Sequence, residues 1–167
     1  MKARIATSGL LALLCVCPVF GQGRGKAEAS VNGKSISIDY GRPSLKGRDI
    51  LSLAPVGTIW RVGMNQATEI TSSGELKVGD KELKAGKYSL WVKKEGADSW
   101  TLLFHPKTGI WGAPALTEGF VAETPLKMEK ASDSAEQLTI SLKGEGDDAQ
   151  IRIQWGTAAL EGKFEVK

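Results

Sequence analysis

Basic side chains gather in the stretch from residue 40 to residue 68, among turn-forming glycines and prolines. Arg42, Lys46 and Arg48 lie close together, and Arg61 follows them. Guanidinium and ammonium groups donate charge-assisted hydrogen bonds, and the planar guanidinium fork matches carboxylate, phosphate and sulfate groups. Long loops with specific turn chemistry often carry binding residues. The pattern therefore predicts that these four side chains hold an anionic ligand.

An amide and an aromatic side chain, Asn65 and Trp111, extend this predicted site. A tryptophan ring can stack on a sugar ring or on a cation, so the expected ligand is an anionic or glycan small molecule. Some of these residues could instead have purely structural roles. Arg42 could brace its loop through backbone carbonyls or pair with Asp39. Asn65 and Gln66 could satisfy the open backbone groups of a β-bulge.

The sequence contains few of the residue types that catalysis commonly uses. His105 is the single histidine, so a two-histidine metal site is excluded, and a Ser-His-Asp arrangement would have to use it. Its place at the end of an expected strand favours a structural role. The acidic run at 144–148 has oxygen ligands that suit calcium but is more typical of a hairpin turn. We predict no catalytic residue, no metal ligand and no cofactor, because nucleophile-elbow and phosphate-loop motifs are also missing from the sequence.

Three carboxylates keep an enzymatic alternative open. A glycosidase needs only two acids across a sugar bond, and Asp39, Asp49 and Glu69 lie near the basic stretch. A carboxylate-dependent hydrolase that uses one of these acids, together with His105, is the first alternative to a binding module. The second alternative is a structural domain that docks a partner chain through an apolar patch or an open sheet edge.

The first 21 residues have the layout of a secretory signal peptide. Lys2 and Arg4 precede an uncharged apolar run from residue 5 to residue 20, and the small Gly21 follows it. The run is shorter than the approximately 20 residues of a membrane-spanning helix, so we expect no stable membrane insertion after cleavage. Both cysteines lie in this segment. The expectation is an exported protein, periplasmic or secreted, whose mature chain has no cysteine.

Cleavage after residue 21 changes the charge balance of the chain. The loss of two basic residues lowers the formal net charge from +3 to +1. A nearly neutral domain argues against nucleic acid as a partner, because phosphate binding depends on clustered positive charge. The remaining length is typical of one domain with its own core. We predict a flexible N-terminus at 22–27 and a single domain at 28–167, and the sequence leaves the oligomeric state open.

Short alternations of apolar and polar residues, separated by glycine-rich turns, recur along the mature chain. Ile36, Ile38 and Tyr40 alternate with polar residues, and Asn32-Gly33 before them is a strong hairpin signal. No segment keeps the 3.6-residue apolar period of a helix. This pattern predicts an all-β, single-domain antiparallel β-sandwich or partly closed barrel with few or no helices. The clearest strands are expected at 27–31, 34–40, 58–62, 67–72, 75–78, 81–83, 87–93, 100–105, 138–142 and 151–155.

Four residues of this framework have expected structural roles. Tyr40 ends a strand, and Pro43 lies in the long loop at 41–55. Trp60 alternates with apolar neighbours, which favours a core position and places Arg61 on the other side of the sheet. Tyr88 begins a strand after a Leu-Lys-Ala-Gly-Lys run, which resembles the corner of a β-sandwich where a tyrosine bonds back to upstream backbone.

Several spaced motifs follow one another in order: Tyr40-Gly41-Arg42-Pro43, Lys46-Gly47-Arg48, Trp60-Arg61-Val62-Gly63, Ala85-Gly86-Lys87-Tyr88 and Trp111-Gly112. In these motifs the chain resembles the bacterial domain-of-unknown-function 2911 family, and the similarity runs over nearly the whole mature chain. The resemblance implies an exported all-β domain and supplies no established activity. Many members carry a tyrosine and acidic residues after the Trp-Gly pair, whereas this chain has Ala-Pro-Ala-Leu-Thr-Glu at 113–118.

Overall fold

The computed structural model describes residues 23–167, and the expected signal peptide lies outside these residues. The described part contains ten strands and one short helix. In order they are β1 (Arg24–Val31), β2 (Lys34–Gly41), α1 (Ile50–Leu53), β3 (Ile59–Trp60), β4 (Thr68–Ser72), β5 (Leu76–Val78), β6 (Lys81–Leu83), β7 (Gly86–Lys94), β8 (Ser99–His105), β9 (Ala122–Glu145) and β10 (Asp148–Val166). No helix among them is long and apolar enough to cross a lipid bilayer.

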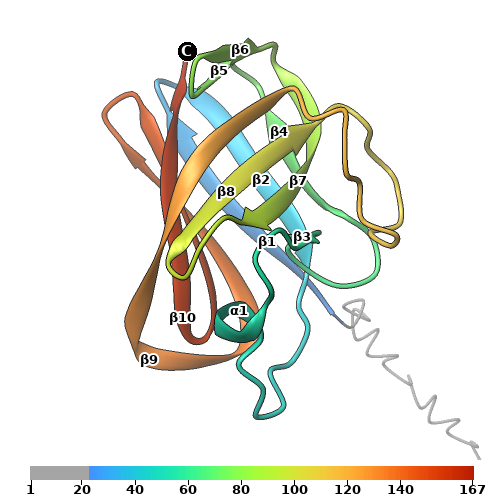
Figure 1. Cartoon of the computed structure of the whole chain (residues 1–167). Helices are drawn as coiled ribbons and strands as arrows, with labels where there is room; N and C mark the ends of the chain where they lie inside the picture. Colours follow the sequence, from blue (N-terminus) through green and yellow to red (C-terminus); the bar gives the residue numbers. More distant parts are fainter. Residues whose placement is uncertain (1–22) are drawn as a thin grey trace, which may run out of the picture.

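One antiparallel sheet contains all of these strands and curls around a single main core (Figure 1). The strand order is β1-β2-β4-β7-β8-β9-β10-β5-β6, and β3 pairs with β7. The first part of β9 pairs with β8, and most of its length pairs with β10. The curled, unclosed sheet confirms the predicted all-β sandwich or partly closed barrel.

The alternation that predicts the strands also fills the core. Ile36 and Ile38 on β2 point inward and are almost completely buried, as are Leu90 and Val92 on β7. Trp91 points to the opposite face of β7, where it is fully buried in a second, smaller cluster. The segment 106–121 covers this cluster from outside, and Figure 1 shows that segment as a long loop beside the sheet. Its apolar residues that pack there are Ile110, Ala115, Leu116 and Phe120.

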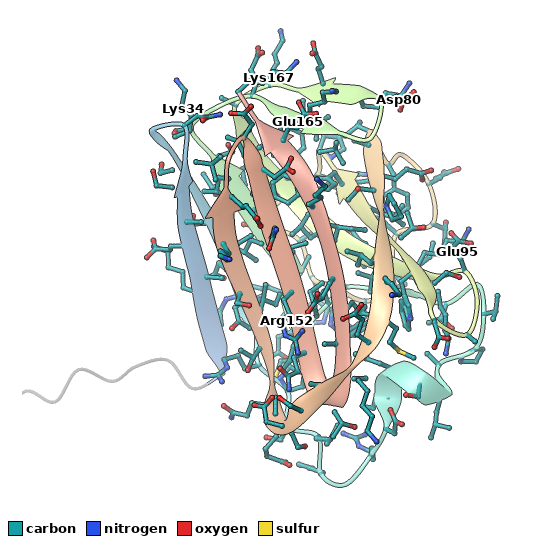
Figure 2. The ribbon with its side chains drawn as sticks, turned by 90° about the vertical axis from the view of Figure 1, so that its left-hand side faces the viewer. Lys34, Asp80, Glu95, Arg152, Glu165 and Lys167 are labelled. Carbon is teal, nitrogen blue, oxygen red and sulfur yellow. The ribbon has the colours of Figure 1, made fainter. Side chains whose placement is uncertain are left out.

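The sheet remains open along a seam between β1 and the second half of β9. These strands lie side by side in both views (Figures 1 and 2) and are in contact, but they are not neighbours in the hydrogen-bonded order. Two side chains from the end of β2 cross this seam: Tyr40 Oη donates to Ile140 O, and Arg42 Nε donates to Leu138 O, both at 3.3 Å. A Cβ atom at Gly25 would lie 2.6 Å from the Tyr40 ring and 2.7 Å from Arg42 Cδ. Glycine on β1 therefore leaves the space through which both side chains reach β9.

The hydrogen bond of Tyr40 across the seam gives a matched pair of predictions, because the protein has only two tyrosines. Tyr40→Phe leaves the buried Ile140 carbonyl without this donor, so we expect a loss of about 1 kcal/mol in the free energy of unfolding. Tyr88→Phe removes a solvent-exposed bond to Lys84 O, which water can replace, so its expected cost is below about 0.5 kcal/mol. Urea denaturation of both variants measures the difference, and equal midpoints would contradict a role for Tyr40 in closing the seam.

Local turn chemistry follows the sequence closely. Asn32 and Gly33 adopt φ values of 52° and 72°, as a type I′ hairpin requires. Tyr88 Oη donates to Lys84 O at 3.0 Å, which is the bond of a tyrosine corner. Strand β1 begins at Arg24 and thus reaches into the range 22–27 that we expected to be flexible, because its first residues pair with the end of β2.

The loop at 41–55 contains a single helical turn, α1, which has no apolar period of its own to predict it. The Asp49 carboxylate accepts a hydrogen bond from Ser52 N at 3.2 Å at the start of this turn. Lys94 is only 4% exposed, and its Nζ donates to Leu51 O and Ser52 O at 3.2 and 2.8 Å. A lysine of β7 thus fixes the helix and its loop to the sheet.

Candidate functional site

Three of the predicted basic residues line one open hollow of about 570 Å³, which we call the basic hollow. Its lining consists of Gly23, Arg42, Pro43, Ser44, Lys46, Arg48, Met64 and Gln137. Gly23 precedes β1 and Gln137 lies on β9, so the basic hollow is at the end of the seam where β1 begins. Figure 1 shows that β1 begins at the same end of the molecule as the loop at 41–55 and α1.

Arg42 is anchored on two sides. Its backbone N donates to Gly23 O at 2.6 Å, and its Nε donates to Leu138 O at 3.3 Å. Pro43 O accepts from Leu138 N at 3.0 Å, and an isolated bridge joins Ser44 to Gln137. These contacts fix the base of the guanidinium, while neither Nη atom has a hydrogen bond to the residues that the structure describes. The terminal donors of Arg42 are therefore unpaired within residues 23–167.

Lys46 and Arg48 lie on the turn that follows. Lys46 has a φ of 52° and Gly47 a φ of 71°, so the chain reverses tightly here. The turn is tied to β9 because Lys46 N donates to a Glu136 carboxylate oxygen at 3.1 Å. Arg48 Nε donates to Leu45 O at 3.3 Å. Both side chains are exposed, and within residues 23–167 neither they nor Arg42 form an ion pair.

Arg61, Asn65 and Trp111 form a second group that does not line the basic hollow. Arg61 Nη1 donates to Gly112 O at 3.2 Å, and Asn65 O accepts from Gly112 N at 2.9 Å. The structure therefore divides the predicted site in two. The link between the halves is Met64, which lines the basic hollow and lies between Arg61 and Asn65 in the chain.

The aromatic residue in the middle of the stretch is part of the packing. Trp60 is half-buried and stacks on Trp155, with ring centroids 5.6 Å apart and an angle of 9° between the planes. This contact occupies one face of the Trp60 ring, so the ring that remains available as a platform is Trp111, which is 60% exposed.

Each candidate carboxylate of the hydrolase alternative has a structural partner. Asp39 forms an ion pair with Arg24, and Asp49 caps the N-terminus of α1. Glu69 accepts a hydrogen bond from Gly109 N at 2.5 Å and pairs with Lys87 at 3.3 Å. The contacts of Asp39 and Glu69 hold neighbouring strands and the 106–121 segment together, and the contact of Asp49 stays within the turn of α1.

The histidine is also engaged in structure. His105 is 9% exposed at the end of β8, and its Nδ1 accepts from Lys107 N at 2.9 Å. The ring packs edge-on against Phe120 at 5.6 Å between centroids. Sheet register places Ser89 opposite His105 and Glu69 opposite Ser89, but the Ser89 hydroxyl is fully buried and accepts from Trp91 Nε1. No group of three or more His, Cys, Asp or Glu side chains among residues 23–167 is arranged to hold a metal ion.

Some residues of the basic hollow have no signal in the sequence. Gln137 lies on a polar stretch of β9 and reaches the hollow only because the loop after β2 bridges to that strand. Ser44 and Met64 also line the basic hollow, and no local pattern in the sequence marks them as site residues. Such residues become visible only when the pairing of segments far apart in the chain is known.

Comparisons with known proteins place the chain in a family without assigning an activity. No curated protein and no solved structure matches it. The family described as "protein of unknown function (DUF2911)" matches residues 23–164, which include every strand except the last residues of β10. The chain belongs to the DUF2911 family.

Proposed function

We propose that this chain is an exported, non-enzymatic binding module whose basic hollow holds an anionic small ligand. The ligand carries a phosphate, sulfate or carboxylate group. The observation that supports this proposal is the lining itself: Arg42, Lys46 and Arg48 contribute to one hollow, and none of its lining residues is acidic. Ser44 and Gln137 add uncharged hydrogen-bonding groups.

The anchoring of Arg42 favours binding. A guanidinium that already bonds Leu138 O through Nε loses less side-chain freedom when its Nη atoms engage an oxyanion. The Glu136 carboxylate accepts a hydrogen bond from the backbone amide of Lys46. Hydrogen bonds to charged groups contribute about 1.5–3 kcal/mol each, so three such donors supply a substantial favourable contribution to the binding of a small anion.

The partners of the candidate acids support a binding role over hydrolysis. A general acid or base must reach the reacting atoms of a substrate. Asp39, Asp49 and Glu69 instead bond Arg24, Ser52 N, Lys87 and Gly109 N within the fold.

A triple substitution tests the proposal. The variant Arg42→Gln, Lys46→Gln, Arg48→Gln should bind inorganic phosphate, sulfate or a galacturonate oligomer about 100-fold more weakly than the wild-type chain. Isothermal titration calorimetry with each probe measures the affinity. The wild-type affinity should also fall when the salt concentration rises from about 20 to about 200 mM, because ions screen exposed charges.

The matched control removes the same charge elsewhere. Lys84, Lys107 and Lys143 are exposed and outside the basic hollow, so their joint replacement by glutamine should leave the affinity within about twofold of wild type. Equal losses in both triple variants would show that only net charge matters. Failure of the wild-type chain to bind any of the three probes would overturn the proposal.

A further inference from the structure

Trp111 differs from the other four tryptophans in its exposure. Trp91, Trp100 and Trp155 are at most 5% exposed and Trp60 is half-buried, whereas 60% of Trp111 faces solvent. A single exposed apolar side chain is common on protein surfaces and needs no functional explanation. Trp111 differs from such a side chain in two ways: its backbone is hydrogen-bonded on both sides, and it is paired with a polar residue.

The backbone on both sides of Trp111 is fixed to the segment before β4. Ala67 N donates to Ile110 O at 3.0 Å, and Gly112 N donates to Asn65 O at 2.9 Å, so residues 110–112 run beside 65–67 as a short antiparallel pair. A Cβ at position 112 would lie 1.9 Å from Arg61 Cδ, which shows how closely Arg61 packs against this glycine. The indole is therefore displayed from a rigid base.

The residue opposite Trp111 in this pair is Gln66. Residues directly opposite each other in an antiparallel pair project to the same face. Gln66 is exposed, and so is Asn65 beside it. An exposed indole with an amide side chain on the same face combines an apolar surface with groups that both donate and accept hydrogen bonds.

We propose that Trp111 and Gln66 form a carbohydrate-binding platform, on which a pyranose ring stacks its C–H face. The indole supplies the flat apolar surface, and the Gln66 amide bonds ring hydroxyls, which are donors and acceptors like the amide itself. The core of a protein interface is enriched in aromatic residues and is surrounded by further contacts that exclude water, whereas the residue paired with Trp111 is polar. The composition therefore favours a sugar over a protein chain.

Arg61 contacts the backbone of this platform. Its Nη1 bonds Gly112 O directly after the indole, and its buried Nε has no hydrogen-bond partner among the described residues. The platform does not depend on the basic hollow, since none of its residues lines that hollow.

Titration with cellohexaose and chitohexaose tests the platform, because both oligomers are uncharged and present flat C–H faces. Tryptophan fluorescence and calorimetry should show binding of at least one oligomer to the wild-type chain. We expect Trp111→Ala to weaken it at least 10-fold and Trp111→Phe to retain most of it. Gln66→Ala should weaken it by about fivefold.

The triple variant of the basic hollow should bind the neutral oligomer like wild type, which separates this inference from the proposed anion site. The platform would be overturned if neither oligomer bound, or if Trp111→Ala bound as well as wild type. It would also be overturned if the wild-type chain self-associated in light scattering, Trp111→Ala abolished this association and the oligomers had no effect, since Trp111 would then belong to an interface between copies.

Discussion

Gly41→Ala is expected to lower the free energy of unfolding by about 3 kcal/mol. A Cβ atom at this position would lie 2.3 Å from Met64 O and 2.8 Å from Met64 N. Both are backbone atoms, so no change of side-chain rotamer removes the clash. The end of β2 and the segment at 62–65 would have to separate. That segment begins with Val62, which is buried in the core.

The segment that must move has little freedom to do so. Val62 and Asn65 have φ values of 54° and 63°, and Thr68 Oγ1 holds Val62 O at 2.8 Å. Non-glycine residues in this left-handed region are uncommon and need support from their surroundings. Because Met64 lines the basic hollow and Asn65 bonds Gly112, the same substitution should weaken both proposed ligand contacts.

Urea denaturation followed by circular dichroism measures the effect, with Gly146→Ala as the control. Gly146 has a φ of 59° and nothing within 4 Å of an added Cβ, so its replacement should cost only the backbone strain of about 1 kcal/mol. Gly41 does not have a positive φ, so the expected loss of stability in Gly41→Ala comes from the steric clash alone. Equal destabilisation by the two variants would contradict the close packing of Gly41 on Met64.

Features determined by neighbouring residues are the ones that the sequence predicts well. The positive φ values at Asn32 and Gly33 follow from these two residue types, because asparagine tolerates the left-handed region and glycine has no Cβ atom to oppose it. The burial of Ile36 and Ile38 follows from the two-residue period of a strand. The bond of Tyr88 to Lys84 O spans four residues. The fold class is the sum of such local signals.

The candidate site depends on contacts that no local pattern encodes. Arg42 and Leu138 are far apart in the chain, and the bond between them exists only because the sheet curls until β2 approaches β9. The bridge between Gln66 and Trp111 likewise joins two irregular segments. Composition therefore indicates the six candidate side chains, whereas their division into a basic hollow and an aromatic platform needs the three-dimensional structure.

Trp155→Ala is expected to lower the free energy of unfolding by about 4 kcal/mol. The ring is 5% exposed, and its parallel contact with Trp60 adds about 0.5–1.5 kcal/mol beyond the burial of its area. Trp155 also lines an open hollow of about 250 Å³ next to Gly156, so removal of the ring widens that hollow. Chemical denaturation followed by far-ultraviolet circular dichroism measures the loss without relying on tryptophan fluorescence.

Two further tryptophan variants test whether the loss of stability depends on the burial of the ring. Trp60→Ala removes the half-buried partner of the same stack and should cost about 2 kcal/mol, because part of that ring already faces solvent. Trp111→Ala removes an exposed ring and should change the stability by less than about 0.5 kcal/mol. A large loss of stability in Trp111→Ala would mean that its ring is needed for folding. An unchanged stability together with lost oligosaccharide binding is the result that a displayed sugar platform requires.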